Sequence, residues 1–218
     1  TPYDASLTIP GTFEDTLSWL ADADWVIEGV VDNLKITQEL LQKVEPYLKP
    51  SAILTTNTSG LAIEKISEKM SKELRARFMG THFFNPPRHM KLLEIIPGKL
   101  TDKDVVSFMA DFCERRLGKS IVFAKDTPNF IANRIGIYAM LCVINIMLED
   151  GYTIDEVDAI TGPPMGRPKS ASFRTSDMVG LDTFIKVAQN VSENVTDAAE
   201  KKEFAVPDFV KKMVEAGL

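Results

Sequence analysis

The sequence has 218 residues, enough for two modest domains, of which 44% are hydrophobic and 26% charged. Its formal net charge of -6 argues against nonspecific attraction to nucleic acid, because neutralising phosphates requires a basic surface. The two cysteines, Cys113 and Cys142, lie in apolar stretches, so we predict reduced core thiols and a cytoplasmic location. We find no run of about 18 apolar residues and no secretory signal, and therefore predict no membrane segment.

The first part of the chain predicts alternating strands and helices. Short apolar or β-branched runs predict strands over residues 25–31, 52–56, 78–84, 91–96 and 120–126. Periodic apolar stripes predict helices over 33–48, 62–70 and 102–117. Strand, helix and strand at this spacing indicate a βαβ unit and hence a parallel sheet, whereas the Pro-rich turn NPPRHM joins the third and fourth strands as a hairpin.

The pattern changes after residue 126. A long apolar helix is predicted over residues 128–149, with Pro128 in its first turn. Further helices are predicted over 153–161, 175–191 and 206–217, and no strand-like run follows residue 126. We therefore predict an α/β domain over residues 1–126 and an all-helical domain over 127–218.

His82 is the first candidate for chemistry. If the turn centred on residues 86–90 closes a hairpin, Asn85 faces Lys91, and the same register sets His82 opposite Glu94. A carboxylate there would fix the imidazole tautomer and stabilise the imidazolium, as a general base requires. The alternative is a histidine packed beside the sheet with an accidental pairing, since a slip of one residue would separate the two side chains.

Other polar residues are weaker candidates. The turn NTSG at 57–60 places Asn57 and Ser59 at the carboxyl end of a predicted parallel strand, where ligands bind in open α/β sheets, although ordinary turn chemistry explains it equally. Asn133 lies in the long apolar helix and needs a partner, either structural or substrate. His89 is interpreted as a solvated turn residue. Two histidines and two distant cysteines have no metal-ligand spacing, so we predict no metal site.

Taken together, these segments resemble the L-3-hydroxyacyl-CoA dehydrogenase family, especially the dehydrogenase part of long multifunctional bacterial β-oxidation proteins. The resemblance is carried by ADWVIEGVVDNLK (23–35), ILTTNTSGLAI (53–63), MGTHFFNPPRHMKLLEII (79–96), KDTPNFIANRIG (125–136) and GRPKSASFRTSDMVGLDT (166–183). It implies the second half of a Rossmann-type domain followed by a helical domain. It also implies hydride transfer from an L-3-hydroxyacyl-CoA to NAD, giving 3-ketoacyl-CoA in fatty-acid β-oxidation.

The family's roles carry over position by position. His82 would be the general base and Glu94 its orienting carboxylate. Ser59 and Asn133 would contact the substrate. The resemblance also implies cofactor-binding residues at the nicotinamide-ribose end, namely Asp32, Asn57 and Asn85. The partners implied are an acyl-CoA substrate and a second copy of the chain, with no nucleic acid and no membrane.

The sequence also departs from the family. It has Asp32 where the family often has Glu, Thr37 where it often has Lys, and Asn129 where it commonly has Gly. A GxGxxG turn, which seats the cofactor's pyrophosphate, does not occur in the chain. We therefore expect a chain truncated at both ends that binds NAD weakly and has little activity by itself.

Two alternatives remain open. One is a related dehydrogenase of free hydroxy acids or sugar acids, which dependence on an acyl-CoA substrate would distinguish. The other is a non-catalytic helical interaction module that retains an old site. The presence of His82, Glu94, Ser59 and Asn133 together favours the dehydrogenase over the module.

Overall fold

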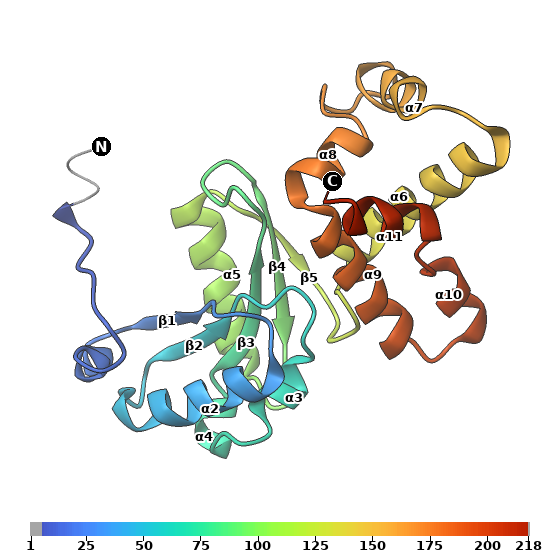
Figure 1. The fold of residues 1–218 in the computed structure, drawn as a ribbon. Coiled ribbons are helices and arrows are strands. Elements are labelled where there is room, and N and C mark those ends of the chain that lie inside the picture. The colour runs from blue at the N-terminus through green and yellow to red at the C-terminus, as the bar shows by residue number, and fades with distance from the viewer. Residues whose placement is uncertain (1–5, 218) are drawn as a thin grey trace. The chain divides into compact units, whose positions relative to one another are not determined.

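The computed structural model describes residues 6–217, and the chain divides into two compact units, Thr1–Asp126 and Thr127–Leu218 (Figure 1). The first unit combines a sheet with helices and the second consists of helices. The predicted class, an α/β domain followed by an all-α domain, is confirmed. Each unit is described below by itself.

The first unit is built on a five-stranded sheet in the order β1-β2-β3-β4-β5. Its strands are β1 (Trp25–Glu28), β2 (Ile53–Thr56), β3 (Phe78–Phe83), β4 (Leu92–Pro97) and β5 (Ser120–Phe123). The first three strands run parallel, β3 and β4 form an antiparallel hairpin, and β4 and β5 are parallel. The predicted parallel pairing of the first strands and the predicted hairpin are therefore both confirmed.

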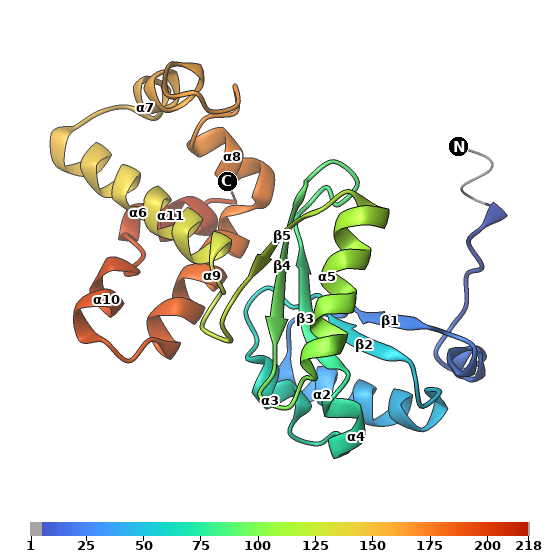
Figure 2. The same ribbon diagram turned by 180° about the vertical axis from the view of Figure 1, so that it is seen from behind.

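Helices cover both faces of this sheet. They are η1 (Leu17–Ala21), α2 (Leu34–Val44), η2 (Glu45–Tyr47), α3 (Ile63–Ser67), α4 (Lys72–Arg75) and α5 (Lys103–Leu117). Helix α5 lies on one face, and α2 and α3 lie on the other, as the opposite views of Figures 1 and 2 show. The helix predicted over 62–70 is shorter, and the 3-10 helix η1 and helix α4 were not predicted.

The core under α5 follows from the alternation of side chains along each strand. Ile53, Met79 and Leu93 pack from three strands against Met109 and Cys113 of α5. Successive strand residues point to opposite faces. The residues of β3 and β4 that alternate with this set, among them His82 and Glu94, therefore face the other side of the sheet, which carries α2 and α3.

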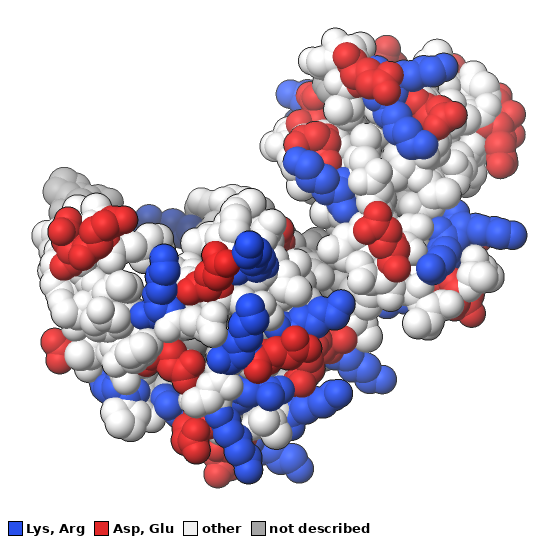
Figure 3. All heavy atoms as spheres, turned by 60° about the horizontal axis from the view of Figure 1, so that its bottom comes forward, with Lys and Arg blue, Asp and Glu red and all other residues white. Residues whose placement is uncertain are grey.

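The surface of the first unit mixes the two signs of charge. Figure 3 shows acidic and basic side chains interspersed over the face that carries α2, α3 and α4. Some of them pair, as in the contact of 3.1 Å between Arg75 Nη2 and Glu64 Oε2. Acidic and basic residues are therefore intermingled on this face.

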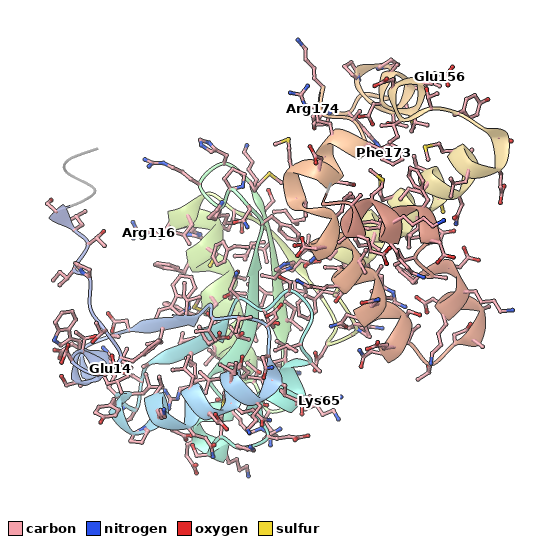
Figure 4. All side chains as sticks on the ribbon, viewed as in Figure 1. Glu14, Lys65, Arg116, Glu156, Phe173 and Arg174 are labelled. Atoms are coloured by element: carbon pink, nitrogen blue, oxygen red, sulfur yellow. The ribbon has the colours of Figure 1, made fainter. Side chains whose placement is uncertain are left out.

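The second unit packs its helices around one apolar core. They are α6 (Ala132–Asp150), α7 (Ile154–Thr161), η3 (Pro163–Met165), α8 (Phe173–Val179), α9 (Leu181–Asn194), α10 (Ala198–Glu203) and α11 (Asp208–Glu215). Leu141 and Ile144 of α6 meet Phe184 of α9 in this core. Phe173, labelled in Figure 4, joins them from the start of α8, where Asp158 accepts its backbone N–H at 2.7 Å.

Two predicted helix boundaries in this unit are wrong, both for backbone reasons. The long helix begins at Ala132, so Pro128 is not in its first turn. The preceding Asn129 and Phe130 have φ of 55° and 52°, in the left-handed region, which a helix cannot pass through. The helix predicted over 175–191 is two helices, because Gly180 between them has φ 95° and ψ 122°.

Helix α6 is the long apolar helix that the sequence predicts. An 18-residue window within its 19 residues has a mean hydropathy of 1.3, enough by length and composition to cross a membrane. Polar residues such as Asn133 and Asn145 interrupt the apolar run, but the mean hydropathy of the helix stays high enough for a candidate membrane span. The same composition occurs in core helices of globular domains, and Leu141, Ile144 and Met147 of α6 are buried in the core of this unit.

Candidate active site

The hairpin of β3 and β4 brings His82 and Glu94 together. They are directly opposed in the register, and His82 Nδ1 lies 2.6 Å from Glu94 Oε2. Both side chains are buried, with 4% and 1% of their surface exposed. The ring of Phe84 packs against the imidazole at a centroid distance of 4.4 Å. The predicted register and the predicted pairing of the two side chains are both confirmed.

This geometry determines which imidazole nitrogen can take up a proton. If Glu94 is ionised, its oxygen can only accept, so that Nδ1 of His82 would donate to it and Nε2 would hold the lone pair. If Nε2 accepts a proton, the adjacent carboxylate stabilises the imidazolium. The pair therefore has the arrangement of a general base with an orienting carboxylate.

The polar residues that follow β1, β2 and β3 are tied together at one edge of the sheet. The Ser59 N–H donates to Asp32 Oδ2 at 3.1 Å, which joins the turn after β1 to the loop after β2. Asn57 Oδ1 accepts the Phe83 N–H at 2.9 Å, which joins that loop to β3. Three of the predicted site residues, Asp32, Asn57 and Ser59, therefore lie in connected segments beside the end of the strand that carries His82.

Further hydrogen bonds hold the loop after β2, both within the loop and at the start of α3. Thr58 is buried, and its Oγ1 accepts the Leu61 N–H at 3.0 Å. At the start of α3, the two carboxylate oxygens of Asp126 accept the N–H groups of Ile63 and Glu64 at 2.8 and 2.9 Å. Sequence analysis missed Asp126, although it is an acidic residue at the end of a predicted strand. The loop that carries Ser59 is consequently anchored at both ends.

Lys119 holds the turn of the hairpin and was also missed. Its ammonium group is buried, donates to Met90 O at 2.8 Å and to Pro87 O, and lies 5.6 Å from the centroid of the Phe83 ring. In the sequence, a lysine at the start of a strand gives no sign of burial. The exposed Asn85, which precedes Pro86 through a cis peptide bond, belongs to the same turn.

The remaining predicted residues are placed as follows. Asn133 is half-buried in the first turn of α6 in the second unit, so its place beside His82 stays a prediction. His89 is exposed in the turn, as predicted. Both cysteines are free thiols, as predicted, but Cys142 is only partly buried. Across residues 6–217, no group of three or more His, Cys, Asp or Glu side chains could hold a metal ion.

Comparison with known proteins identifies the two units. The family model described as "3-hydroxyacyl-CoA dehydrogenase, NAD binding domain" matches residues 4–127, and the one described as "3-hydroxyacyl-CoA dehydrogenase, C-terminal domain" matches residues 130–218. A Bacillus subtilis protein named as a 3-hydroxyacyl-CoA dehydrogenase is 51% identical over 212 residues, which are 97% of this chain and 27% of that protein.

Two further relatives extend the comparison. A Rickettsia felis protein, named as a fatty acid oxidation complex trifunctional enzyme, is 34% identical over 95% of this chain and 29% of its own length. The crystal structure of (S)-3-hydroxybutyryl-CoA dehydrogenase from Ralstonia eutropha superposes with a TM-score of 0.81 at 26% identity, covering 92% of this chain and 68% of that one. The chain thus spans between a quarter and a third of the two named curated relatives. Because both family models match and together span nearly all of it, this chain belongs to the 3-hydroxyacyl-CoA dehydrogenase family.

Proposed function

We propose that the protein oxidises L-3-hydroxyacyl-CoA to 3-ketoacyl-CoA with NAD, in fatty-acid β-oxidation. The observation that carries this proposal is the buried pair of His82 and Glu94, joined at 2.6 Å. The names of the relatives support the substrate class, since one acts on (S)-3-hydroxybutyryl-CoA and another belongs to a fatty acid oxidation complex.

In the proposed reaction, the proton and the hydride of the alcohol go to different acceptors. His82 Nε2 takes the proton of the 3-hydroxyl group, and Glu94 stabilises the resulting imidazolium. The Ser59 hydroxyl hydrogen-bonds the substrate oxygen. Asp32, Asn57 and Asn85 would hold the nicotinamide end of NAD, which would supply the acceptor for the hydride from C3. A positioned base contributes roughly 10²–10⁴ to the rate.

The residues of the first unit fit the nicotinamide end of this cofactor. Asp32, Asn57 and Asn85 follow three adjacent strands at the edge of the sheet where ligands of such folds bind. Asn57 Oδ1 is engaged by Phe83 N–H, while its amide nitrogen makes no hydrogen bond within residues 6–217 and is available to donate. Thr37, at a position where the family often has Lys, is buried at 1% exposure, so the cofactor-side contacts come from the other three residues.

Substitution of the base tests the proposal. We expect His82→Gln to lower turnover of a 3-hydroxyacyl-CoA by at least about 10²-fold at saturating NAD, because the base acts in the transition state. We expect Glu94→Gln, which keeps the side-chain size, to lower turnover by at least about tenfold. His89→Gln, in the exposed turn, is the matched control and should leave turnover unchanged. Equal turnover of the wild-type and His82→Gln chains would contradict the proposal.

A second measurement does not depend on turnover. Nitrogen-15 NMR of the histidine rings should show His82 with its hydrogen on Nδ1 and its lone pair on Nε2. The hydrogen found on Nε2 instead would contradict the proposed role of Glu94. Acyl-CoA dependence is tested by comparing a 3-hydroxyacyl-CoA with the free 3-hydroxy acid, and equal rates would favour a dehydrogenase of free hydroxy acids.

We further propose that the protein is a homo-oligomer of the cytoplasm. The supporting observations are its edge strand β1, which bears the exposed Ile27, and its two free thiols, which suit a reducing compartment. Cell fractionation would test the location, and recovery in the membrane fraction would contradict it.

A further inference from the structure

Glu28 is a buried acidic residue to which the proposed mechanism gives no role. It is the last residue of β1, and only 7% of its surface is exposed. Its Oε1 accepts the Val30 N–H at 2.7 Å, and its Oε2 accepts the Thr56 hydroxyl at 2.5 Å. Burying a carboxyl group is unfavourable unless it is hydrogen-bonded. Both oxygens of Glu28 are satisfied by groups at the edge of the sheet that bears the site.

Thr56 extends this contact into the loop that carries Ser59. Thr56 is fully buried, and it faces Glu28 directly in the register of β1 and β2. Its Oγ1 donates to Glu28 and accepts the Thr58 N–H at 3.3 Å. The Asn57 N–H donates to the main-chain oxygen of Glu28 at 2.8 Å. The first two residues of the loop are therefore both anchored on Glu28, one directly and one through Thr56.

The same carboxyl group also organises the turn after β1. That turn contains Val30, which donates to Glu28, and Asp32, which accepts the Ser59 N–H at 3.1 Å. Ser59 is thus held along two routes that both begin at Glu28. One route passes through Thr56 and Thr58, and the other through the turn and Asp32. A change at Glu28 would loosen both at once.

We propose that Glu28 is a positioning residue, which acts through Thr56 and the turn after β1 to set the place of Ser59 beside His82. The inference rests on the proposed function, in which Ser59 hydrogen-bonds the substrate oxygen. A substitution far from the reacting atoms can cost about 10² in rate if it misplaces a reacting group by about 1 Å. Glu28 accordingly affects catalysis without contacting the substrate.

Two neighbouring threonines provide a matched test. Thr56→Val removes the hydroxyl that links Glu28 to the loop. Thr55→Val removes a hydroxyl from the adjacent, equally buried residue, which bonds Trp25 and Thr81 on the opposite face of the sheet. Both substitutions preserve size and should destabilise the unit similarly. We expect kcat/KM for the acyl-CoA substrate to fall at least about tenfold in Thr56→Val and to change by less than about twofold in Thr55→Val.

Rescue and non-additivity separate positioning from general damage. Thr56→Ser restores the hydroxyl and should restore kcat/KM to within a few-fold of wild type. Glu28→Gln should lower kcat/KM at least about fivefold, because its amide has one acceptor oxygen where the carboxylate has two, so either the Thr56 hydroxyl or the Val30 N–H loses its acceptor. Combining Glu28→Gln with Thr56→Val should lower kcat/KM no more than the worse single change, because both changes act on the same contact between Glu28 and Thr56.

Amide hydrogen exchange supplies a readout that does not need enzymatic activity. We expect the Thr58 and Ser59 amides to exchange at least about tenfold faster in Thr56→Val than in Thr55→Val. Unchanged exchange at these amides would overturn the inference. Faster exchange with no acyl-CoA turnover in any chain, wild type included, would uphold the anchoring by Glu28 and contradict the proposed function instead. Equal losses of kcat/KM in the two threonine variants would also overturn the inference.

Discussion

Gly80 offers a test of how closely α3 must approach the sheet that carries the site. It lies in β3, two residues before His82 and on the same face, under Ile63 of α3 and Ile96 of β4. A methyl group at Gly80 would lie 2.9 Å from Ile63 Cδ1, 3.0 Å from Ile96 Cδ1 and 3.1 Å from Ile96 Cβ. Carbon atoms at optimal contact are about 3.5–4.0 Å apart. The two Cδ1 atoms can rotate away, but Ile96 Cβ moves only with its strand.

The expected cost of Gly80→Ala follows from two opposing effects. Overpacking a closely packed core typically costs about 1–3 kcal/mol. Replacing glycine by alanine within a strand returns about 0.5–1 kcal/mol, because the unfolded chain loses conformational freedom. From the middle of each range, we therefore expect Gly80→Ala to lower the free energy of unfolding of the first unit by about 1 kcal/mol.

Urea unfolding followed by tryptophan fluorescence would measure this change. Both tryptophans, Trp19 and Trp25, lie in the first unit, so the signal reports that unit. Gly29→Ala is the matched control, because a methyl group at Gly29 would meet no atom within 4 Å. A Gly80→Ala chain as stable as wild type, or more stable, would refute the packing argument.

Three further predictions concern the stability and assembly of the chain. Lys119→Met should lower the unfolding free energy of the first unit by about 1.5–3 kcal/mol, since a charged donor to two turn carbonyls is lost; an unchanged urea midpoint would contradict this. Burial raises the pKa of Cys113 from 9.0 to about 11. The unfolded thiol therefore loses its proton first, so the free energy of unfolding should fall as pH rises from 9.0 to about 11. The fall should be less steep in Cys113→Ala, and equal slopes in the two chains would contradict this prediction. Sedimentation should show self-association through the exposed edge of β1, and a monomer at every concentration would exclude it.

The pairing of His82 with Glu94 could be predicted from the sequence. His82 and Glu94 are 12 residues apart on one hairpin, so the turn length and the two-residue period of strands decide that they oppose each other. The order of strands and helices in the first unit, and the change to helices after residue 126, followed from equally local periodicity. In each case the interacting residues are near in sequence, and the number of possible arrangements is small.

Backbone conformation at single residues escaped the sequence analysis. Asn129 looked like the first turn of a helix but has a positive φ, and its side chain donates to Val187 O at 2.8 Å, 58 residues away. Asparagine tolerates this region better than most residues, which accounts for Asn where the family commonly has Gly. Gly180 divided a periodic apolar stripe that a sequence pattern joins into one helix.

The sequence by itself determined the two-part fold, the family and the opposition of His82 and Glu94. Only the tertiary structure decided how the loops at the site are held. Glu28 meets Thr56 across 28 residues, Asp32 meets Ser59 across 27, and Lys119 meets Met90 across 29. The bonds of Glu28 and Lys119 are selected by burial, because a carboxyl or ammonium group removed from water must find a partner wherever the packed strands bring one. Which residues become partners depends on the assembled sheet, and no local sequence pattern predicts it.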